Sequence, residues 1–409
     1  MSMTVPHRIL IAPSGFKESL DAETVARAIG AGVRRVLPGV HIDLVPIPDG
    51  GEGTAAIVAR TTGGDLVPAR VTGPVGQTVT ARWARLGGTG ANTAVVEIAA
   101  AAGLRLVPRG DRDPGATTTR GVGELVLAAL DDGMRTIIIG CGDSGTSDGG
   151  AGALAALGVV LRDEDGAELP DGGRHLTRLR SLDFSGLDPR LADTELVLAC
   201  NITNVLCGDH GVARVFGPQK GASPEQVEHL SAALENWAAI LTRDAPHATG
   251  LDVRLGGGTG ASGGLGAGLA AGLGASLVAR FEALLGIGLG RVDLDDLIAR
   301  ADLVITAEGA IDYQTPHGKV PAEIAIRAQR VGVPVLGLAG SIGDGAPAVH
   351  DIGIAAIASI MTIPMPLQDA VDQGEALLRD AAERTLRLVL LGSSISARQT
   401  DRGRHLQSL

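Results

Sequence analysis

Residues 8–53, RILIAPSGFKESLDAETVARAIGAGVRRVLPGVHIDLVPIPDGGEG, contain the pattern that decides the fold. The apolar run at 8–13 predicts a buried strand, and the apolar spacing of 22–37 predicts an amphipathic helix. A second strand is predicted at 42–48, and the glycines and acids of 49–53 open the next helix. Strands and helices that alternate in this way form parallel, doubly wound sheets.

The same alternation returns near the other end of the sequence, and the region between is less regular. The late strands are predicted at 302–306, 333–339 and 352–360, with helices at 320–331 and 367–391. The middle region has predicted strands at 78–86, 93–99, 136–140 and 195–200 and a helix at 118–131. We therefore expect an α/β protein. Residues 1–72 and 290–395 would form a doubly wound parallel-sheet domain, 73–289 an inserted second α/β domain, and 396–409 a loose tail.

The composition excludes several classes of protein. The 409 residues are 45% hydrophobic but only 2% aromatic, and 60 are glycine, so the core must be built from small aliphatic side chains. A net charge of −11 argues against nucleic acids and anionic membranes as partners. Cys141, Cys200 and Cys207 form no metal-binding or disulfide pattern, and no secretory leader is visible, so we expect a cytoplasmic protein.

The uncharged stretch at 255–279 superficially resembles a membrane span. It is rich in glycine, however, and glycine inserts poorly into a bilayer. A buried or ligand-facing loop followed by a helix is the favoured interpretation.

Lysine is rare in this chain. Of 35 basic residues, only Lys17, Lys220 and Lys319 are lysines, and each lies beside glycine-rich or turn-like sequence. A compact ammonium group reaches phosphate oxygens where a planar guanidinium does not fit. The three lysines are therefore predicted to be functional, although chance survival on the surface is the alternative.

Two acidic motifs follow predicted strands. The DGGEG motif at 49–53 places Asp49 and Glu52 on a turn, where they could bind a metal or a substrate hydroxyl, or Glu52 could simply stabilise a helix N-terminus. The segment 308–319 brings Glu308, Asp312 and Lys319 to the end of another strand. Carboxylates beside a lysine suit Mg²⁺ and a transferring phosphoryl group.

The segment 143–150, DSGTSDGG, lies between a strand and a small-residue helix. Backbone N–H groups at such a position bind anions, so phosphate is the expected ligand. The GDSG sequence also matches the nucleophile segment of chymotrypsin-like proteases. The α/β pattern and the lack of a disulfide framework argue against that class.

The glycine tract at 256–266 contains G-x-G-x-x-G at Gly258, Gly260 and Gly263. A dinucleotide-binding site would require a strong strand before it, and the preceding segment is short. A mononucleotide or phosphate loop is favoured over an NAD site.

Taken together, these motifs resemble the bacterial two-domain glycerate kinase family from about residue 9 to residue 391. The resemblance is carried by 16–20, 49–54, 118–124, Ser144 with 148–152, 203–204, 216–222, 263–267, and 308–321. All three lysines fall inside these motifs. The resemblance implies an ATP-dependent, Mg²⁺-dependent kinase that phosphorylates D-glycerate or a related small hydroxy acid.

The resemblance also implies the site residues. The catalytic set is Lys17, Asp49, Asp148 and Lys319, and the metal ligands are Glu308 and Asp312. The residues implied for substrate or phosphate binding are Ser19, Glu52, Arg120, Ser144, Asn204, Lys220, Gly263 and Gly264.

Three positions depart from the family pattern. Ser14 and Asn201 stand where the family has aspartates, and Ala310 stands where it has an arginine, while Asp143 adds a carboxylate. These changes remove charges that could anchor or activate an acceptor. Two alternatives to an ordinary glycerate kinase therefore stay open: a relative with a changed acceptor, and a non-catalytic relative that only binds nucleotide or acid. An NAD-dependent oxidoreductase is a more distant alternative.

Overall fold

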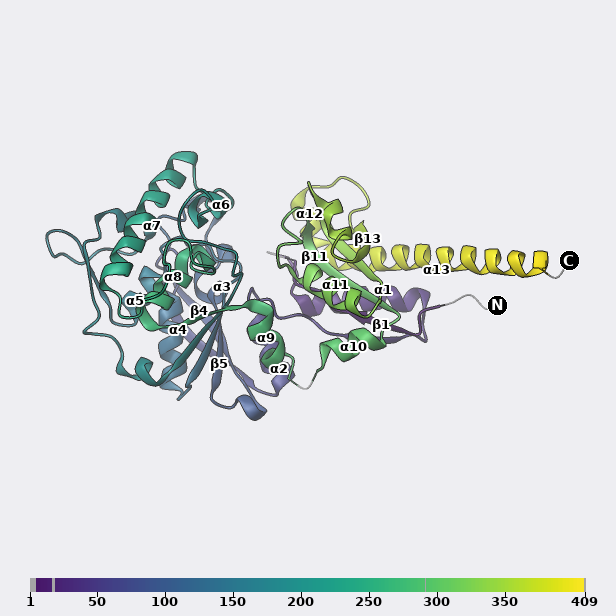
Figure 1. Ribbon diagram of the computed structural model, residues 1–409, viewed down its shortest axis with the longest axis horizontal. Coiled ribbons are helices and arrows are strands. Elements are labelled where there is room, and N and C mark those ends of the chain that lie inside the picture. The colour runs from purple at the N-terminus through teal and green to yellow at the C-terminus, as the bar shows by residue number, and fades with distance from the viewer. Residues whose placement is uncertain (1–4, 17–18, 291, 408–409) are drawn as a thin grey trace. The chain divides into compact units, whose positions relative to one another are not determined.

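The computed structural model describes residues 5–16, 19–290 and 292–407 (Figure 1). The chain divides into a terminal unit, residues 1–47 with 292–409, and an inserted unit, residues 48–291. The first boundary differs from the one at residue 72 that the sequence suggested. The reason is that strand β3 (Asp65–Thr72) pairs along its whole length with β4 (Thr78–Arg85) of the inserted unit.

The terminal unit is built on a parallel sheet with the strand order β13-β12-β11-β1-β2 among the described residues. Counted within this unit from the β2 edge, the order is 2-1-3-4-5, which is one of the two common doubly wound arrangements. Winding reverses between β1 and β11, and ligands of such folds bind at the carboxyl ends of those two strands. The strands are β1 (Arg8–Ile11), β2 (His41–Leu44), β11 (Leu303–Ile311), β12 (Val335–Ile342) and β13 (Ile354–Ser359).

Helices cover both faces of this sheet. Residues of α1 and α13 share one apolar cluster with β1, β11 and β12, and Gly32 of α1 lies so close to α13 that a Cβ would meet the Arg379 carbonyl oxygen at 2.1 Å. Helices α10 and α11 contact the same strands outside that cluster, on the opposite face. The helices are α1 (Ala22–Val36), α10 (Leu294–Arg300), α11 (Val320–Arg330), α12 (Leu367–Asp372) and α13 (Gly374–Gln407), with a 3₁₀ turn at Ala346–His350.

Helix α13 corrects one expectation. A loose tail was predicted from residue 396, but the helix continues to Gln407, as the yellow ribbon in Figure 1 shows. The polar, arginine-rich composition that suggested a tail is also compatible with a helix, because arginine and glutamine are good helix formers.

The inserted unit has a mixed sheet with the order β10-β9-β6-β5-β4-β3. The first four strands are parallel, whereas β4 runs antiparallel to both β5 and β3. The remaining strands are β5 (Thr93–Glu97), β6 (Thr136–Gly140), β9 (Glu195–Cys200), β10 (Ser276–Ala279) and the separate pair β7 (Val160–Arg162) and β8 (Ser181–Asp183). The expected α/β class is confirmed in both units.

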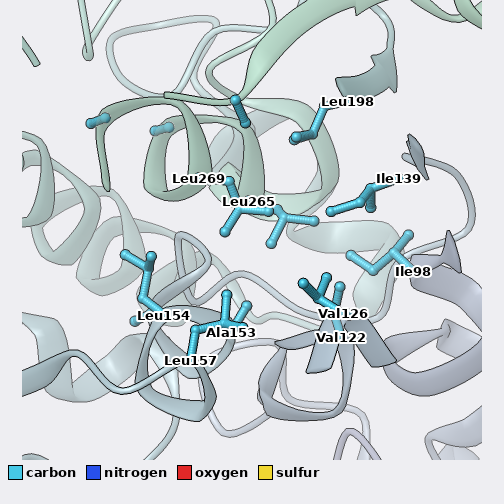
Figure 2. Packing of buried hydrophobic residues seen from close by; sticks show 14 of the residues in the cluster. Ile98, Val122, Val126, Ile139, Ala153, Leu154, Leu157, Leu198, Leu265 and Leu269 are labelled. Carbon is cyan, nitrogen blue, oxygen red and sulfur yellow. The ribbon is translucent and has the colours of Figure 1, made fainter. Parts of the chain in front are cut away.

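The main core of the inserted unit lies between this sheet and one layer of helices. Leu265 and Leu269 of α8 pack towards Ile139 and Leu198 of the sheet, with Val126 of α4 nearby (Figure 2). Helices α2 and α9 share a second cluster on the other face. The helices are α2 (Thr54–Thr62), α3 (Ile98–Ala102), α4 (Arg120–Asp131), α5 (Ala151–Ala156), α6 (Val212–Phe216), α7 (Pro224–Asp244), α8 (Ala261–Leu273) and α9 (Arg280–Gly288). The 3₁₀ turns are Gly88–Gly90, Leu104–Leu106, Arg109–Asp111, Gly173–Arg178, Pro189–Asp193 and Pro218–Lys220.

The uncharged stretch at 255–279 is a loop, helix α8 and strand β10, and the helix is buried in the protein core. Within the described parts of the chain, no helix combines the length and hydropathy needed to cross a membrane.

Candidate active site

At the carboxyl end of β11 in the terminal unit, Lys319 lies between two carboxylates. Its Nζ is 3.2 Å from Glu308 Oε1 and 3.3 Å from Asp312 Oδ1, and it also donates a hydrogen bond of 3.2 Å to the Ala310 carbonyl oxygen. The three charged side chains are between 11% and 24% exposed, so the group is shielded but open to a ligand. The structure thus brings together the cation and both acids that the sequence predicted for this strand end.

Local geometry explains how Lys319 returns to the strand. Asp312 Oδ1 accepts the Gln314 N–H, and Thr315 Oγ1 accepts the Asp312 N–H, which together fix a tight turn after β11. Lys319 is the N-cap residue of α11, and a proline in the first turn of that helix fixes its direction. The lysine side chain is therefore directed back to β11 by the turn and the helix start together.

The segment after β1 carries the other predicted residues of the terminal unit. Lys17 lies outside the described residues. Ser19 is half-buried, and its N–H donates a hydrogen bond of 2.9 Å to the Phe16 carbonyl oxygen, so it belongs to a tight turn. The departure Ser14 is buried, and its hydroxyl donates to the Ala307 carbonyl oxygen at 3.2 Å. A serine thus fits this position without leaving a polar group unsatisfied.

In the inserted unit, the DGGEG turn and the loop after β6 meet. Asp49 Oδ1 accepts the Gly51 N–H at 2.9 Å, and Asp143 Oδ2 accepts the Glu52 N–H at 3.2 Å. Glu52 is exposed and forms an ion pair with Arg105. Asp143 has a φ of +54°, a backbone conformation that is costly for a residue with a side chain. The added carboxylate at 143 therefore binds the neighbouring turn.

Lys220 binds the loop at 143–150 from the protein interior. Its Nζ donates hydrogen bonds to Ser144 Oγ at 3.0 Å and to the Thr146 carbonyl oxygen at 2.6 Å. Lys220 is only 4% exposed, and this burial lowers its pKa to about 7, although the charge of Asp148 opposes the shift. Lys220 was predicted to bind substrate or phosphate directly. In the structure it contacts Ser144, which is partly exposed, and its role in binding substrate or phosphate stays a prediction.

Asp148 has a structural environment. It is fully buried, and its carboxylate accepts hydrogen bonds from Thr119 N, Thr119 Oγ1, Gly150 N and Gly152 N at 2.8 to 3.2 Å. Burial raises its pKa, and these hydrogen bonds oppose the rise. The carboxylate has no exposed surface and holds the loop through these hydrogen bonds, and its catalytic role stays a prediction.

Arg120 is already paired. Its guanidinium makes two hydrogen bonds to Asp171, of 2.7 and 2.8 Å, and the Asp171 carboxylate raises the pKa of Arg120. A bidentate pair of this kind competes with an anionic ligand. The sequence predicted a substrate-binding arginine here, and the structure adds a partner that sequence analysis missed.

The glycine tract packs against the loop at 143–150. Gly263 has a φ of +73°, and a Cβ there would lie 2.0 Å from the Thr146 carbonyl oxygen; Gly264 has a φ of +93°. The Gly263 carbonyl oxygen accepts the Gly149 N–H at 3.0 Å. Asn204 holds the other end of the tract, because its carbonyl oxygen accepts N–H groups from Gly258 and Gly260. The loop at 143–150 and the glycine tract at 256–266, each predicted to bind phosphate, are thus packed against each other and joined by a hydrogen bond.

The environment of the tract also argues against a dinucleotide site. The residues before Gly258 form turns, whereas a dinucleotide fingerprint directly follows a strand. Asn201, the third departure, accepts hydrogen bonds from Thr203 N and Thr203 Oγ1 and so stabilises a turn after β9.

One buried acid was missed entirely by sequence analysis. Glu97, at the end of β5, is 6% exposed and accepts N–H groups from the start of α2. The only signal in the sequence was an acid that ends an apolar strand. Among the described residues, no three or more histidine, cysteine or acidic side chains gather as a ready-made metal site.

A doubly wound unit with a lysine between carboxylates at its switch point, together with a unit that carries glycine-rich loops at strand ends, has the parts of an α/β phosphotransferase. Comparison with known proteins makes this specific. The model of the glycerate kinase family matches residues 9–390, and the chain belongs to that family.

Several relatives are similar over nearly their whole length. The chain is 44% identical over 380 residues to the glycerate kinase of Bacillus subtilis (strain 168), covering 93% of this chain and 96% of the relative. It is 46% identical over 363 residues to the glycerate 2-kinase of Escherichia coli (strain K12), covering 89% and 93%. A crystal structure from Salmonella typhimurium LT2, described as a glycerate kinase 2, matches with a TM-score of 0.72 and 42% identity, covering 95% of this chain and 99% of that one.

Proposed function

We propose that this protein is an ATP-dependent kinase that phosphorylates D-glycerate, and that the acceptor is the 2-hydroxyl group. The observation that carries the proposal is the family match over residues 9–390, together with 46% identity to an E. coli protein named glycerate 2-kinase. Kinases of this kind are phosphotransferases with an alcohol group as acceptor.

The group around Lys319 supplies the charges that phosphoryl transfer needs. The reaction moves negative charge between oxygens, so positioned cations supply most of the catalysis. Lys319 is shielded from bulk solvent and lies at the switch point of the sheet, where a phosphate oxygen could replace one of its carboxylate partners. Its compact ammonium suits that exchange.

Glu308 and Asp312 are the proposed Mg²⁺ ligands. Mg²⁺ in kinases keeps several waters and binds through one or two carboxylates plus substrate phosphates, so this pair fits the ion although no larger acidic cluster exists among the described residues. When bound, the ion would neutralise negative charge on the phosphate oxygens. The two carboxylates now hold Lys319, and a metal would share them with that lysine.

The loop assembly of the inserted unit is proposed to bind an anionic group. The partly exposed Ser144 hydroxyl is the proposed donor to this group, and the Lys220 ammonium, 3.0 Å from Ser144 Oγ, orients it. Asp148 keeps the loop in place through its buried hydrogen bonds. Lys17, Ser19, Asp49, Glu52, Arg120 and Asn204 stay proposals for the ligand-binding and catalytic set.

The three departures do not favour a non-catalytic relative. Ser14 and Asn201 make local hydrogen bonds, and Ala310 offers its carbonyl oxygen to Lys319. Each change is therefore accommodated without disturbing the charged group at Lys319. The group of Lys319, Glu308 and Asp312 therefore supports a catalytic relative.

A coupled assay of ADP release tests the proposal and its alternatives. D-glycerate, L-glycerate, glycolate and D-lactate would be compared with ATP and Mg²⁺ present. We expect D-glycerate to be the preferred acceptor. Preference for another acid would identify a changed acceptor. Calorimetric nucleotide binding without turnover of any acid would identify a binding protein and overturn the proposal.

We further propose that the protein works in the reducing cytoplasm. Its three cysteines are free thiols in the structure, and Cys200 and Cys207 are buried. Oxidising compartments favour paired cysteines. Localisation of a tagged chain in its own cells would test this.

A further inference from the structure

Glu97 holds the start of helix α2 and, through it, the DGGEG turn. Its Oε1 accepts the Ala55 N–H at 2.5 Å, and its Oε2 accepts the Gly53 N–H at 3.3 Å. The N-cap residue of α2 is Gly53, which has no side chain to cap the helix. The first amides of a helix need acceptors, and a carboxylate is the best one because it also meets the positive end of the helix dipole. Glu97, at the end of strand β5, therefore caps helix α2 in place of a side chain at Gly53.

The turn depends on few other contacts. Asp49 Oδ1 accepts the Gly51 N–H, Thr54 Oγ1 accepts the Gly50 N–H, and Asp143 Oδ2 accepts the Glu52 N–H. Glu97 accepts the N–H groups of Gly53 and Ala55, while the Thr54 N–H between them donates to the Gly51 carbonyl oxygen. Among the acids that bind this segment in these contacts, Glu97 is the buried one.

Two physical effects make this carboxyl group sensitive to protons. Burial is the main cause that raises the pKa of Glu97 to about 8; the charges of Glu52 and Asp49 act in the same direction, and the hydrogen bonds from the Ala55 and Gly53 N–H groups oppose the shift. A protonated carboxyl carries a hydrogen on one oxygen, and that oxygen no longer accepts an N–H well. Protonation thus removes one of the two bonds, and the longer one, to Gly53, is the weaker.

Other charged groups near the turn do not replace this function. Glu52 is paired with Arg105, and Asp143 is engaged with the Glu52 N–H. Arg280 of α9 donates a hydrogen bond to the Asp49 carbonyl oxygen. These groups set the local field that Glu97 feels, but none of them accepts the Gly53 or Ala55 amide.

We propose that Glu97 is a positioning residue whose ionised form fixes the Asp49–Gly53 turn in its active geometry, so that activity rises as Glu97 loses its proton. The proposal rests on the proposed kinase function, because it assigns Asp49 and its turn to the working site. Glu97 itself touches no substrate.

The first test compares pH profiles of kcat/KM for D-glycerate between pH 6.5 and 9.5. A group with a pKa of about 8 is mostly protonated at pH 7 and mostly ionised at pH 9, so we expect the wild type to rise about tenfold over that interval. The kcat/KM of Glu97→Gln should stay, at every pH, near the value that the wild type has at pH 7. At pH 9 it should therefore be about tenfold below that of the wild type. The control is Glu195→Gln at the exposed start of β9, which should keep the rise.

The shape of the profile separates this role from a merely structural one. If Glu97→Gln lowers kcat/KM by the same factor at every pH, the proposal is overturned. Because the variant could fail to fold, a second measurement uses the wild type alone: the amide ¹H and ¹⁵N shifts of Gly53 and Ala55 are followed by NMR. We expect both to titrate with a midpoint near pH 8; unchanged shifts between pH 7 and 9 would also overturn the proposal.

The two proposals fail in different ways. Absence of kinase activity at every pH would remove the proposed function, while the amide titration would still report on the Glu97 contact. Normal activity with identical profiles for wild type and Glu97→Gln would remove only the inference about Glu97.

Discussion

Lys319 Nζ lies 3.2 Å from Glu308 Oε1, and both side chains are mostly withdrawn from solvent. In a chain where lysine is rare, this ammonium group sits at the point of the terminal sheet where winding reverses. One of the few lysines of the chain is therefore found where the proposed phosphoryl transfer needs a cation. An ion pair in such a place is weak support for stability, and its position at the switch point is what makes Lys319 a candidate for binding anions.

The first prediction concerns that lysine. Lys319→Met and Lys319→Arg should each lower kcat/KM for D-glycerate by about 100-fold, the size typical of losing one positioned charge-stabilising group. Arginine should fail because its planar fork would pair bidentately with a carboxylate such as Glu308, instead of presenting a compact charge to a phosphate oxygen. Steady-state kinetics measures the effect, and Arg330→Lys at the exposed end of α11 should stay within about twofold of wild type. Full activity of Lys319→Arg would show that only the charge matters.

The second prediction concerns Mg²⁺. Glu308→Gln and Asp312→Asn should each weaken binding of ADP about tenfold when Mg²⁺ is present, because each removes one proposed ligand. With excess chelator the two variants should bind ADP at least as well as wild type, since Lys319 then has one carboxylate fewer to hold it. Isothermal calorimetry measures both conditions, and exposed Asp351→Asn serves as the control. Equal losses with and without Mg²⁺ would count against a metal at these residues.

The third prediction concerns the buried Lys220. Burial lowers its pKa to about 7, far below the value near 10 of an unfolded lysine. Between these two pKa values the side chain of residue 220 binds more protons in the unfolded chain than in the folded one, so the contribution of Lys220 to stability should rise with pH by up to about 1.4 kcal/mol per pH unit. Glu97, whose pKa is raised to about 8, contributes a slope of the opposite sign, so the effect of Lys220 is obtained from the difference between wild type and Lys220→Met. Below about pH 7 the cost of burying the charge is present in full.

Urea unfolding at pH 7 and pH 9 measures this slope. Lys220→Met removes the titrating group, so its deficit relative to wild type should grow as pH rises. Ser144→Ala removes a hydrogen-bond partner but keeps the lysine, and should therefore retain the wild-type slope. A deficit of Lys220→Met that is constant with pH would contradict the account.

The fourth prediction compares two glycines with similar backbone conformations. Gly263 has a φ of +73° and Gly250 a φ of +82°, but only at Gly263 would a Cβ collide, at 2.0 Å from the Thr146 carbonyl oxygen. Gly250→Ala should cost roughly 1–2 kcal/mol, the usual penalty of a left-handed residue. Gly263→Ala should cost about 3 kcal/mol or more, because the loop at 143–150 must also move. Chemical denaturation measures both, and equal costs would show that the loops are not tightly packed.

Much of the terminal unit could be predicted from its sequence, because its strands are apolar runs and its helices are periodic. The contact of Lys319 with Glu308 and Asp312 was also predictable, since the three residues lie within a dozen positions of one another after one strand. The domain boundary was missed because β3 pairs with β4 rather than with the strands that precede it. Strand pairing of this kind leaves no local signal.

The contacts that redefine the candidate site join residues far apart in the sequence. Arg120 meets Asp171, and Glu97 meets the start of α2, across more than 40 residues in each case. The burial of Asp148 likewise results from Thr119 on another segment. The motifs pointed to Arg120 and Asp148 but not to Asp171 or Glu97, because a sequence motif does not show which distant residues pair with its side chains.

The central claim is that the protein phosphorylates D-glycerate at its 2-hydroxyl, and the most direct measurement is ³¹P NMR of the reaction of purified protein with ATP, Mg²⁺ and D-glycerate. The account predicts 2-phosphoglycerate and ADP in equal amounts, with a kcat/KM for D-glycerate of about 10⁴ M⁻¹ s⁻¹ or more. No phosphoglycerate under these conditions, or 3-phosphoglycerate as the first product, would contradict it.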